Sequence, residues 1–226
     1  FLYFFPCVLC VWMPFYMARC HLMKYPVWWS NFETQENSGI GSNGLTSARH
    51  DMLCKYYAEL YPETFDPNLP ADLVYCGPYK LEDPLPASSL NVGEAILSPT
   101  RSYAPVINNI LKTMRDEVKG IIHCSGGAQT KCMKFGNNIH FIKDNLFPTP
   151  ALFAAIQQAS DTPWDEMYKV FNMGHRMEVY VPETSVAEVI SLAAELGIAA
   201  KRIGQTIAAD SNQLTLTAPT GENYHY

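Results

Sequence analysis

The chain has 226 residues, of which 48% are hydrophobic and 17% charged, and its formal net charge is −6. This composition is typical of a globular protein that buries a sizeable core. Because the sequence contains no basic stripe or arginine-rich run, we do not expect a nucleic acid as partner.

The seven cysteines are irregularly spaced. Cys7 and Cys10 form a C-x-x-C pair, but neither a second pair nor a histidine pair follows at the spacing of a zinc site. No cluster of acidic residues has the spacing of a magnesium site. We therefore expect seven reduced thiols in a cytoplasmic protein, with no metal-binding residues in this chain.

Residues 1–36 differ from the remainder, and the first 18 residues carry no charge. A membrane anchor needs about 20 uninterrupted apolar residues, but Pro6 and Pro14 break this stretch. A signal peptide needs a basic start and a small-residue cleavage site, and neither is present. We favour a third interpretation, in which 1–36 is an artefactual or disordered leader without membrane contact and 37–226 is the domain. A membrane-tethered protein is a weaker alternative.

The hydrophobic pattern from Gly44 onward predicts regular elements in chain order. Helices are expected over 45–60, 105–117, 129–135, 150–159, 164–171 and 183–196. Strands are expected over 120–124, 138–143, 175–181, 199–207 and 213–218, and six prolines make 62–92 rich in loops. The alternation in 175–181 predicts a strand that is buried on one face. This mixture predicts an α/β fold, a sandwich of helices packed on one face of a mixed sheet.

The turn Ser42-Asn43-Gly44 leads directly into the first predicted helix, which carries Arg49 in its second turn. A helix N-terminus offers unpaired N–H groups and a partial positive charge, so it suits an anion such as phosphate. Gly44 lets the backbone approach a ligand, and Arg49 can add a forked donor. Ser42 and Asn43 can donate to a ligand or cap the helix, and an ordinary N-cap explains the same residues.

Two further positions suggest a ligand site. Thr100 and Arg101 lie in a polar turn before a predicted helix, where a surface arginine is the alternative explanation. His123 ends an apolar strand directly before a turn of small residues, which is where ligands often meet an α/β sheet. Histidine is suited to proton transfer near neutral pH, although a lone histidine is more often a core residue.

The segments 41–50, 97–103, 120–128 and 168–177 occur in the order and at the spacings of a known family. Together they resemble the C-terminal half of phosphoribosylformylglycinamidine cyclo-ligase (aminoimidazole ribonucleotide synthetase) over about residues 39–226. The resemblance implies the fold of that domain and ATP-dependent ring closure of formylglycinamidine ribonucleotide to aminoimidazole ribonucleotide in purine biosynthesis. It also implies a truncated chain, because ATP and Mg²⁺ are bound mostly by an N-terminal domain that this sequence does not contain. The full-length enzyme is expected to be a homodimer.

The resemblance assigns roles to individual residues. It implies that His123 is catalytic and that Gly126, Gly127, Asn172 and Gly174 bind the nucleotide. The residues implied to bind the substrate phosphate or its ribose are Ser42, Asn43, Gly44, Arg49, Thr100 and Arg101. Asp144 and Asn145 follow a strand and are weaker candidates, because turn formation explains them equally well.

The sequence departs from the family at two positions. Gly41 replaces a histidine that often precedes the Ser-Asn-Gly turn. Ala128 replaces a third glycine in the turn after His123, and we expect it to narrow the space at that turn only slightly. Two alternatives stay open: another ATP-using member of the same superfamily, and a non-catalytic module that binds ribonucleotide phosphates.

Overall fold

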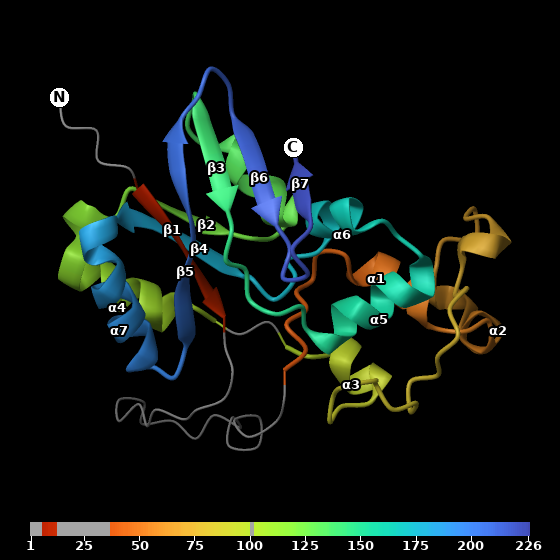
Figure 1. Cartoon of the computed structure of the whole chain (residues 1–226). Helices are drawn as coiled ribbons and strands as arrows, with labels where there is room; N and C mark the ends of the chain where they lie inside the picture. The colour runs from red at the N-terminus through yellow and green to blue at the C-terminus, as the bar shows by residue number, and fades with distance from the viewer. Residues whose placement is uncertain (1–5, 13–36, 100–101) are drawn as a thin grey trace.

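The structure, a computed structural model, describes residues 6–12, 37–99 and 102–226 (Figure 1). Its centre is a seven-stranded mixed sheet with the strand order β2-β4-β1-β5-β3-β6-β7. The strands are β1 (Pro6–Trp12), β2 (Gly120–His123), β3 (Ile139–Lys143), β4 (Met177–Pro182), β5 (Ala199–Ala208), β6 (Gln213–Thr217) and β7 (Asn223–His225). Neighbouring strands are antiparallel except β3 and β6, which are parallel.

Seven α-helices accompany the sheet in the described part of the chain. They are α1 (Leu45–Met52), α2 (Tyr56–Leu60), α3 (Val92–Ile96), α4 (Ala104–Met114), α5 (Ala151–Ser160), α6 (Trp164–Val170) and α7 (Val186–Ala194). Short 3₁₀ helices span Pro62–Thr64, Ala71–Leu73, Arg115–Glu117, Ala128–Lys134 and Glu183–Ser185. In Figure 1, α4 and α7 lie together beside the sheet, whereas α1, α2, α3 and α5 form a helical lobe on its other side.

Both faces of the sheet are covered, and β4 demonstrates this. Val179 and Val181 pack in the hydrophobic cluster that α4 and α7 contribute to, whereas Tyr180, between them, belongs to the larger cluster that includes the helical lobe. Residues 178–182 are all buried. The α/β class, the mixed sheet and the packed helices are confirmed. The prediction of a half-buried strand is wrong, because Glu178 and Tyr180, on the polar-looking side of β4, contact Lys143 and Phe141 of β3.

The predicted helix 45–60 is also wrong in one respect, since it breaks into α1 and α2. Leu53 adopts an extended conformation and forms a β-bridge with Tyr79. Gly77 permits this pairing, because a Cβ at Gly77 would lie 2.1 Å from the carbonyl carbon of Met52. Pairing with a distant segment therefore overrides the helical period of the local sequence.

Strand β1 was not predicted, because its residues were grouped with the apolar leader. It lies between β4 and β5, where Val8 pairs with both Tyr180 and Gly204. A short apolar run suits a central strand covered on both faces. The division into 1–36 and 37–226 stays a prediction, and residues 13–36 lie outside the described part.

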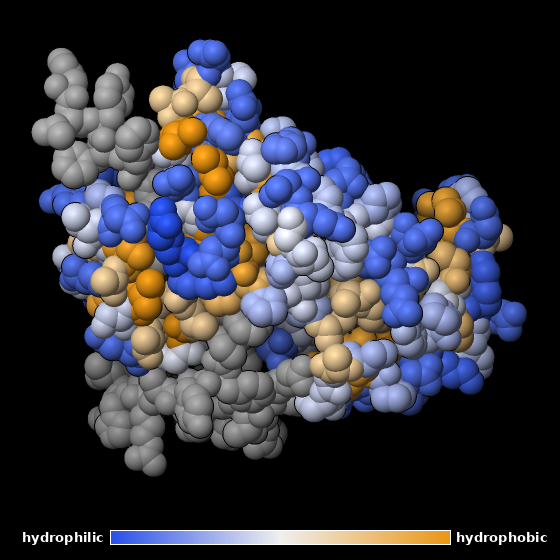
Figure 2. Space-filling view, in the orientation of Figure 1, coloured by the Kyte–Doolittle hydropathy of each residue, from blue (hydrophilic) through white to orange (hydrophobic). Residues whose placement is uncertain are grey.

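The other predicted elements are found within a few residues of their expected bounds, although 129–135 forms a 3₁₀ helix. The short helix α3 was missed, and it begins with a reciprocal capping box between Asn91 and Glu94. Figure 2 shows hydrophobic side chains in separate patches on a largely polar face. Within the described residues, every helix is too short or too polar to cross a lipid bilayer.

Candidate functional site

Two turns that are far apart in the sequence meet in the structure. The Ser42–Gly44 turn precedes α1, and the Ser125–Gly127 turn follows β2. A Cβ built on Gly126 would lie 3.6 Å from Asn43 Oδ1, with no other described atom within 4 Å apart from its chain neighbours. Gly126 therefore borders open space beside Asn43, and two of the predicted segments are brought together.

The turn before α1 is held in place by the end of α6. The amide nitrogen of Asn43 donates to the Val170 carbonyl over 2.7 Å. Gly44 has a left-handed backbone with φ of +81°, and a Cβ there would lie 2.5 Å from Cε1 of Phe171. Glycine is thus required at this position both for its conformation and for its close approach to an aromatic ring.

Neither Ser42 nor Asn43 caps α1, so the alternative of an ordinary side-chain N-cap is wrong. The N-cap residue is Gly44, and it makes no side-chain cap hydrogen bond. The amide nitrogen of Asn43 binds Val170 instead, and its Oδ1 lies on the side of Gly126. Asn43 thus presents an acceptor to this space, whereas Ser42 is exposed.

Arg49 faces the helical lobe. Its guanidinium lies over the ring of Tyr75, 5.7 Å from the centroid. Its Nε is buried and has no hydrogen-bond partner among the described residues. No ion pair or hydrogen bond within the described part of the chain joins Arg49 to the Ser42–Gly44 turn. The assignment of Arg49 to the same anion stays a prediction.

The loop Asn172–Gly174 is a compact turn built from its own polar groups. Asn172 Oδ1 accepts from the Gly174 backbone N–H over 2.8 Å, and the Asn172 carbonyl accepts from Gln129 Nε2 over 2.8 Å. Gly174 has φ of +84°. A Cβ built on Gly39 would lie 3.3 Å from the Cα of Gly174. Asn172 is buried, so it shapes this loop, and its contact with a nucleotide stays a prediction.

Arg176 ties the segment Asn37–Ile40 to this loop. Its Nε donates to the Gly39 carbonyl over 3.0 Å, and Nη2 donates to the Ile40 carbonyl and to Asn37 Oδ1. The Asn37 amide in turn donates to the Pro99 carbonyl over 3.0 Å. Pro99 leads directly to Thr100 and Arg101, which lie outside the described residues, so their predicted phosphate contacts stay predictions.

His123 lies at the exposed end of β2, opposite Met177 of β4. Partial burial of the ring lowers the pKa of His123, and the positive charges of Lys131 and Arg176 lower it further. The imidazole is therefore neutral near pH 7 and has a nitrogen that can accept a proton. This is the protonation state that the predicted role in proton transfer requires.

The neighbouring His175 has a structural role. It is fully buried, its Nε2 accepts from the Phe147 N–H over 3.0 Å, and Nδ1 donates to the Met173 carbonyl over 3.1 Å. Burial lowers the pKa of His175 to about 3. Only the neutral ring with its proton on Nδ1 can make both bonds, so His175 fixes the loop before β4.

Lys131, in the 3₁₀ helix that follows the turn after β2, is a cation that the sequence motifs did not identify. Lys131 Nζ donates to Ser125 Oγ over 2.5 Å. Its Cα and Cβ lie 3.5 Å from the position of a Cβ on Gly127, whose φ is +88°. Ala128 has φ of +45° and is buried. The glycine expected at this position would relieve backbone strain, so the substitution affects backbone conformation as well as the predicted narrowing.

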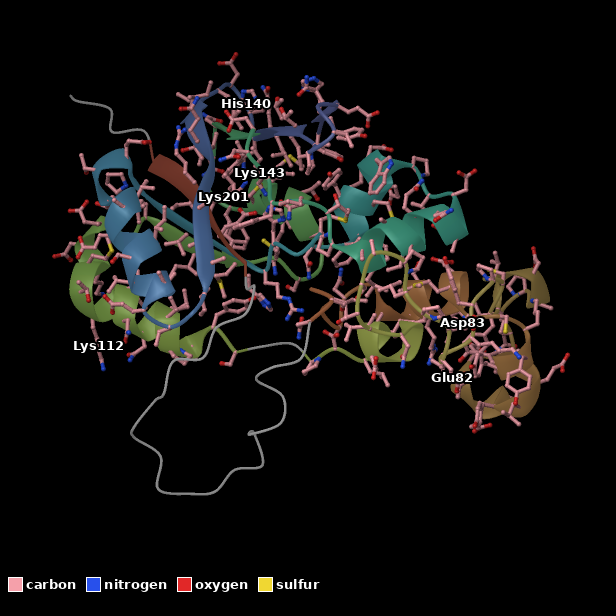
Figure 3. The ribbon with its side chains drawn as sticks, turned by 60° about the horizontal axis from the view of Figure 1, so that its bottom comes forward. Glu82, Asp83, Lys112, His140, Lys143 and Lys201 are labelled. Atoms are coloured by element: carbon pink, nitrogen blue, oxygen red, sulfur yellow. The ribbon has the colours of Figure 1, made fainter. Side chains whose placement is uncertain are left out.

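A buried ion pair beneath this turn was also missed. Lys143 Nζ lies 2.5 Å from Glu178 Oε1, with side-chain exposures of 0% and 1%. Lys143 also donates to the carbonyl and the side-chain oxygen of Gln129. Tyr180 OH donates to Glu178 Oε2 over 2.6 Å, and Cys124 Sγ donates to Oε1 over 3.3 Å. Figure 3 shows Lys143 among the strands, far from Glu82 and Asp83 of the helical lobe.

The Lys143 network connects the turn to the loop, because Gln129 binds Lys143 and also Asn172. Burial disfavours the ammonium, but the neighbouring Cys132 and Glu178 together raise the pKa of Lys143. Among residues whose side chains are described, Cys54, Cys76 and Cys132 are free thiols. The described residues contain no group of three or more His, Cys, Asp or Glu side chains suited to a metal ion.

Comparison with known proteins gives the family. The family described as "AIR synthase related protein, C-terminal domain" matches residues 79–217. The phosphoribosylformylglycinamidine cyclo-ligase of Methanocaldococcus jannaschii is 33% identical over 171 residues, covering 76% of this chain and 43% of that protein. The protein of the same name from Methanothermobacter thermautotrophicus is 32% identical over 187 residues, covering 83% of this chain and 47% of that one. The chain thus spans less than half the length of these relatives.

The crystal structure of Escherichia coli HypE, a hydrogenase maturation protein, aligns with 58% of this chain and 39% of its own, at 15% identity and a TM-score of 0.40. Since the match of the family extends over more than half of the 226 residues, the chain belongs to the AIR synthase related proteins and contains their C-terminal domain.

Proposed function

We propose that this chain is the C-terminal part of a phosphoribosylformylglycinamidine cyclo-ligase of purine biosynthesis. The whole enzyme would close the ring of formylglycinamidine ribonucleotide to give aminoimidazole ribonucleotide, ADP and phosphate. One observation carries the proposal: segments that resemble the family's motifs lie close together although they are far apart in the sequence. Asn43 borders Gly126 and binds Val170, whereas Asn37 binds Pro99. Such convergence of distant loops at the end of a strand is typical of a ligand site.

The residues would divide the work as follows. Backbone N–H groups at Gly44 and the start of α1, with Ser42 and Arg49, would hold the phosphate or ribose of the substrate. Thr100 and Arg101 would add donors from the segment after Pro99. Gly126, Gly127 and Gly174 would let the backbone approach the nucleotide, and Asn172 would keep the last of these loops in shape.

ATP would activate the formyl amide oxygen as a phosphate ester. The amidine nitrogen would then attack the amide carbon, and phosphate would leave with that oxygen. His123, neutral near pH 7 because of its surroundings, would accept the proton that the attacking nitrogen loses. As the resemblance implies, Mg²⁺, most ATP contacts and the dimer contacts would come from an N-terminal domain outside these 226 residues. The enzyme would act in the cytoplasm.

The test compares the chain alone with a fusion to the N-terminal half of the Methanocaldococcus jannaschii relative. ADP release is measured with formylglycinamidine ribonucleotide and with substrates of other ATP-using members of the superfamily. We expect turnover by the fusion with the first substrate, no turnover by the chain alone, and loss of turnover in the fusion carrying His123→Gln. Turnover by the isolated chain, or full activity of the His123→Gln fusion, would contradict the proposal. Tight binding of the ribonucleotide without turnover in the fusion would favour a non-catalytic module.

A further inference from the structure

The pair Ser125 and Lys131 is built for an anion. The ammonium of Lys131 has three N–H donors, and one of them is directed to Ser125 Oγ at 2.5 Å. The Ser125 hydroxyl accepts that bond, so its own proton stays free to be donated. The Cα and Cβ of Lys131 lie beside Gly127, and the Lys131 residue is half-buried.

The charge of Lys131 is not balanced by a carboxylate. None of the ion pairs in the described part of the chain includes Lys131. The charged groups that act on the adjacent His123 are Lys131 and Arg176, and both are positive. A chain with a net charge of −6 thus concentrates positive charge at this turn. Such a local surplus attracts anions more strongly than an exposed lysine does.

The space beside the pair suits a hydroxylated ligand. Gly126 leaves the surface open, and the nearest group across the turn is Asn43 Oδ1. The amide nitrogen of Asn43 is bound to Val170, so Asn43 offers an acceptor here and repels a phosphate. A ligand that fits must place an anion on Ser125 and Lys131 and a hydroxyl group on Asn43.

We propose that Ser125 and Lys131 bind the phosphate of a phosphorylated sugar and that Asn43 Oδ1 accepts a hydroxyl group of the same sugar. The inference deepens the proposed function, on which it rests, because the substrate named there is a phosphorylated ribose. It places the phosphate of the substrate on Ser125 and Lys131 and leaves the ribose to the Ser42–Gly44 turn. Lys131 is then a specificity-determining residue.

The test uses ribose 5-phosphate, ribose and inorganic phosphate as probes of the full chain by titration calorimetry at low salt. Lys131→Met removes the charge and keeps most of the stem. Lys134→Met is the matched control, because Lys134 is exposed on the same 3₁₀ helix. We expect ribose 5-phosphate to bind more tightly than ribose, Lys131→Met to weaken it about tenfold or more, and Lys134→Met to leave it within about twofold. Ser125→Ala should weaken it several-fold and serves if Lys131→Met does not fold.

Equal binding of ribose 5-phosphate by Lys131→Met and the wild-type chain would overturn the inference, as would a wild-type chain that binds ribose equally well. If Lys134→Met weakened ribose 5-phosphate binding as much as Lys131→Met, the weakening would reflect a general attraction of anions, and the inference would again be overturned. Asn43→Asp should weaken ribose 5-phosphate through repulsion more than it weakens ribose. A fusion without ring-closing activity whose ribose 5-phosphate binding still depends on Lys131 would refute the proposed function alone.

Discussion

The buried pair of Lys143 and Glu178 allows a quantitative test of the fold beneath the site. Two opposite charges about 4 Å apart attract by roughly 4 kcal/mol at an effective dielectric constant of about 20. Their nitrogen and oxygen lie 2.5 Å apart at near-zero exposure. Removing one partner strands the other in the core, which typically costs about 3–5 kcal/mol. We therefore expect Lys143→Met and Glu178→Met each to lower the free energy of unfolding by about this amount.

The double variant separates the loss of an attraction from the burial of an unpaired charge. With both charges gone, the groups that lose a hydrogen bond are neutral: the Tyr180 hydroxyl, the Cys124 thiol and the two oxygens of Gln129. Each such loss costs about 1 kcal/mol, so their sum is comparable to the cost of one stranded charge. The double variant should therefore be no less stable than either single variant, which gives a coupling of several kcal/mol. Urea unfolding at pH 7, followed by circular dichroism, measures all four proteins. Lys169→Met is the control, because Lys169 pairs with Asp165 and Glu166 on the surface, and its unfolding midpoint should not move. Additive losses in the double variant would refute the reasoning.

Two further predictions follow from other groups around the site. Since the pKa of His175 is about 3 in the folded chain and about 6.5 when unfolded, the unfolded state binds the extra proton between these values. The contribution of His175 to the free energy of unfolding is thus complete above about pH 6.5 and falls by about 2 kcal/mol at pH 5. Protonation of His50 and His123 adds losses of the same sign. In urea titrations His175→Gln should flatten this pH dependence, and an unchanged pH dependence would contradict the role given to His175. Gly44→Ala should destabilise by well over the roughly 1–2 kcal/mol of a left-handed alanine, because its Cβ meets the Phe171 ring. Gly221→Ala, with φ of +95° and open space around it, should show the backbone cost alone, and equal losses for the two variants would contradict the clash.

Much of the fold was predictable because most elements keep one hydrophobic period from end to end. The strands β2, β3, β5 and β6 and the helices α4, α5 and α6 lie where the pattern placed them. Two of the failures have a common physical cause, since each involves a partner distant in sequence. The helix break at Leu53 depends on Tyr79, and the burial of Glu178 depends on Lys143. An alternating strand has the same sequence pattern whether its polar side faces water or a buried cation.

The candidate site shows the same limit at finer scale. Sequence motifs identified which loops matter, since the turns at Asn43 and Gly126 meet, but they did not determine which atoms each loop presents. Asn43 was read as a donor or a cap, because those are the local uses of an asparagine before a helix. Its amide nitrogen is instead bound to Val170, a residue from another helix, and this single contact turns its oxygen toward the open space. Lys131 was overlooked for the complementary reason: a lysine in a polar helix carries no signal until Ser125 and Gly127 are seen beside it. A motif therefore locates a binding loop, whereas the chemistry that the loop offers depends on the residues that hold its side chains.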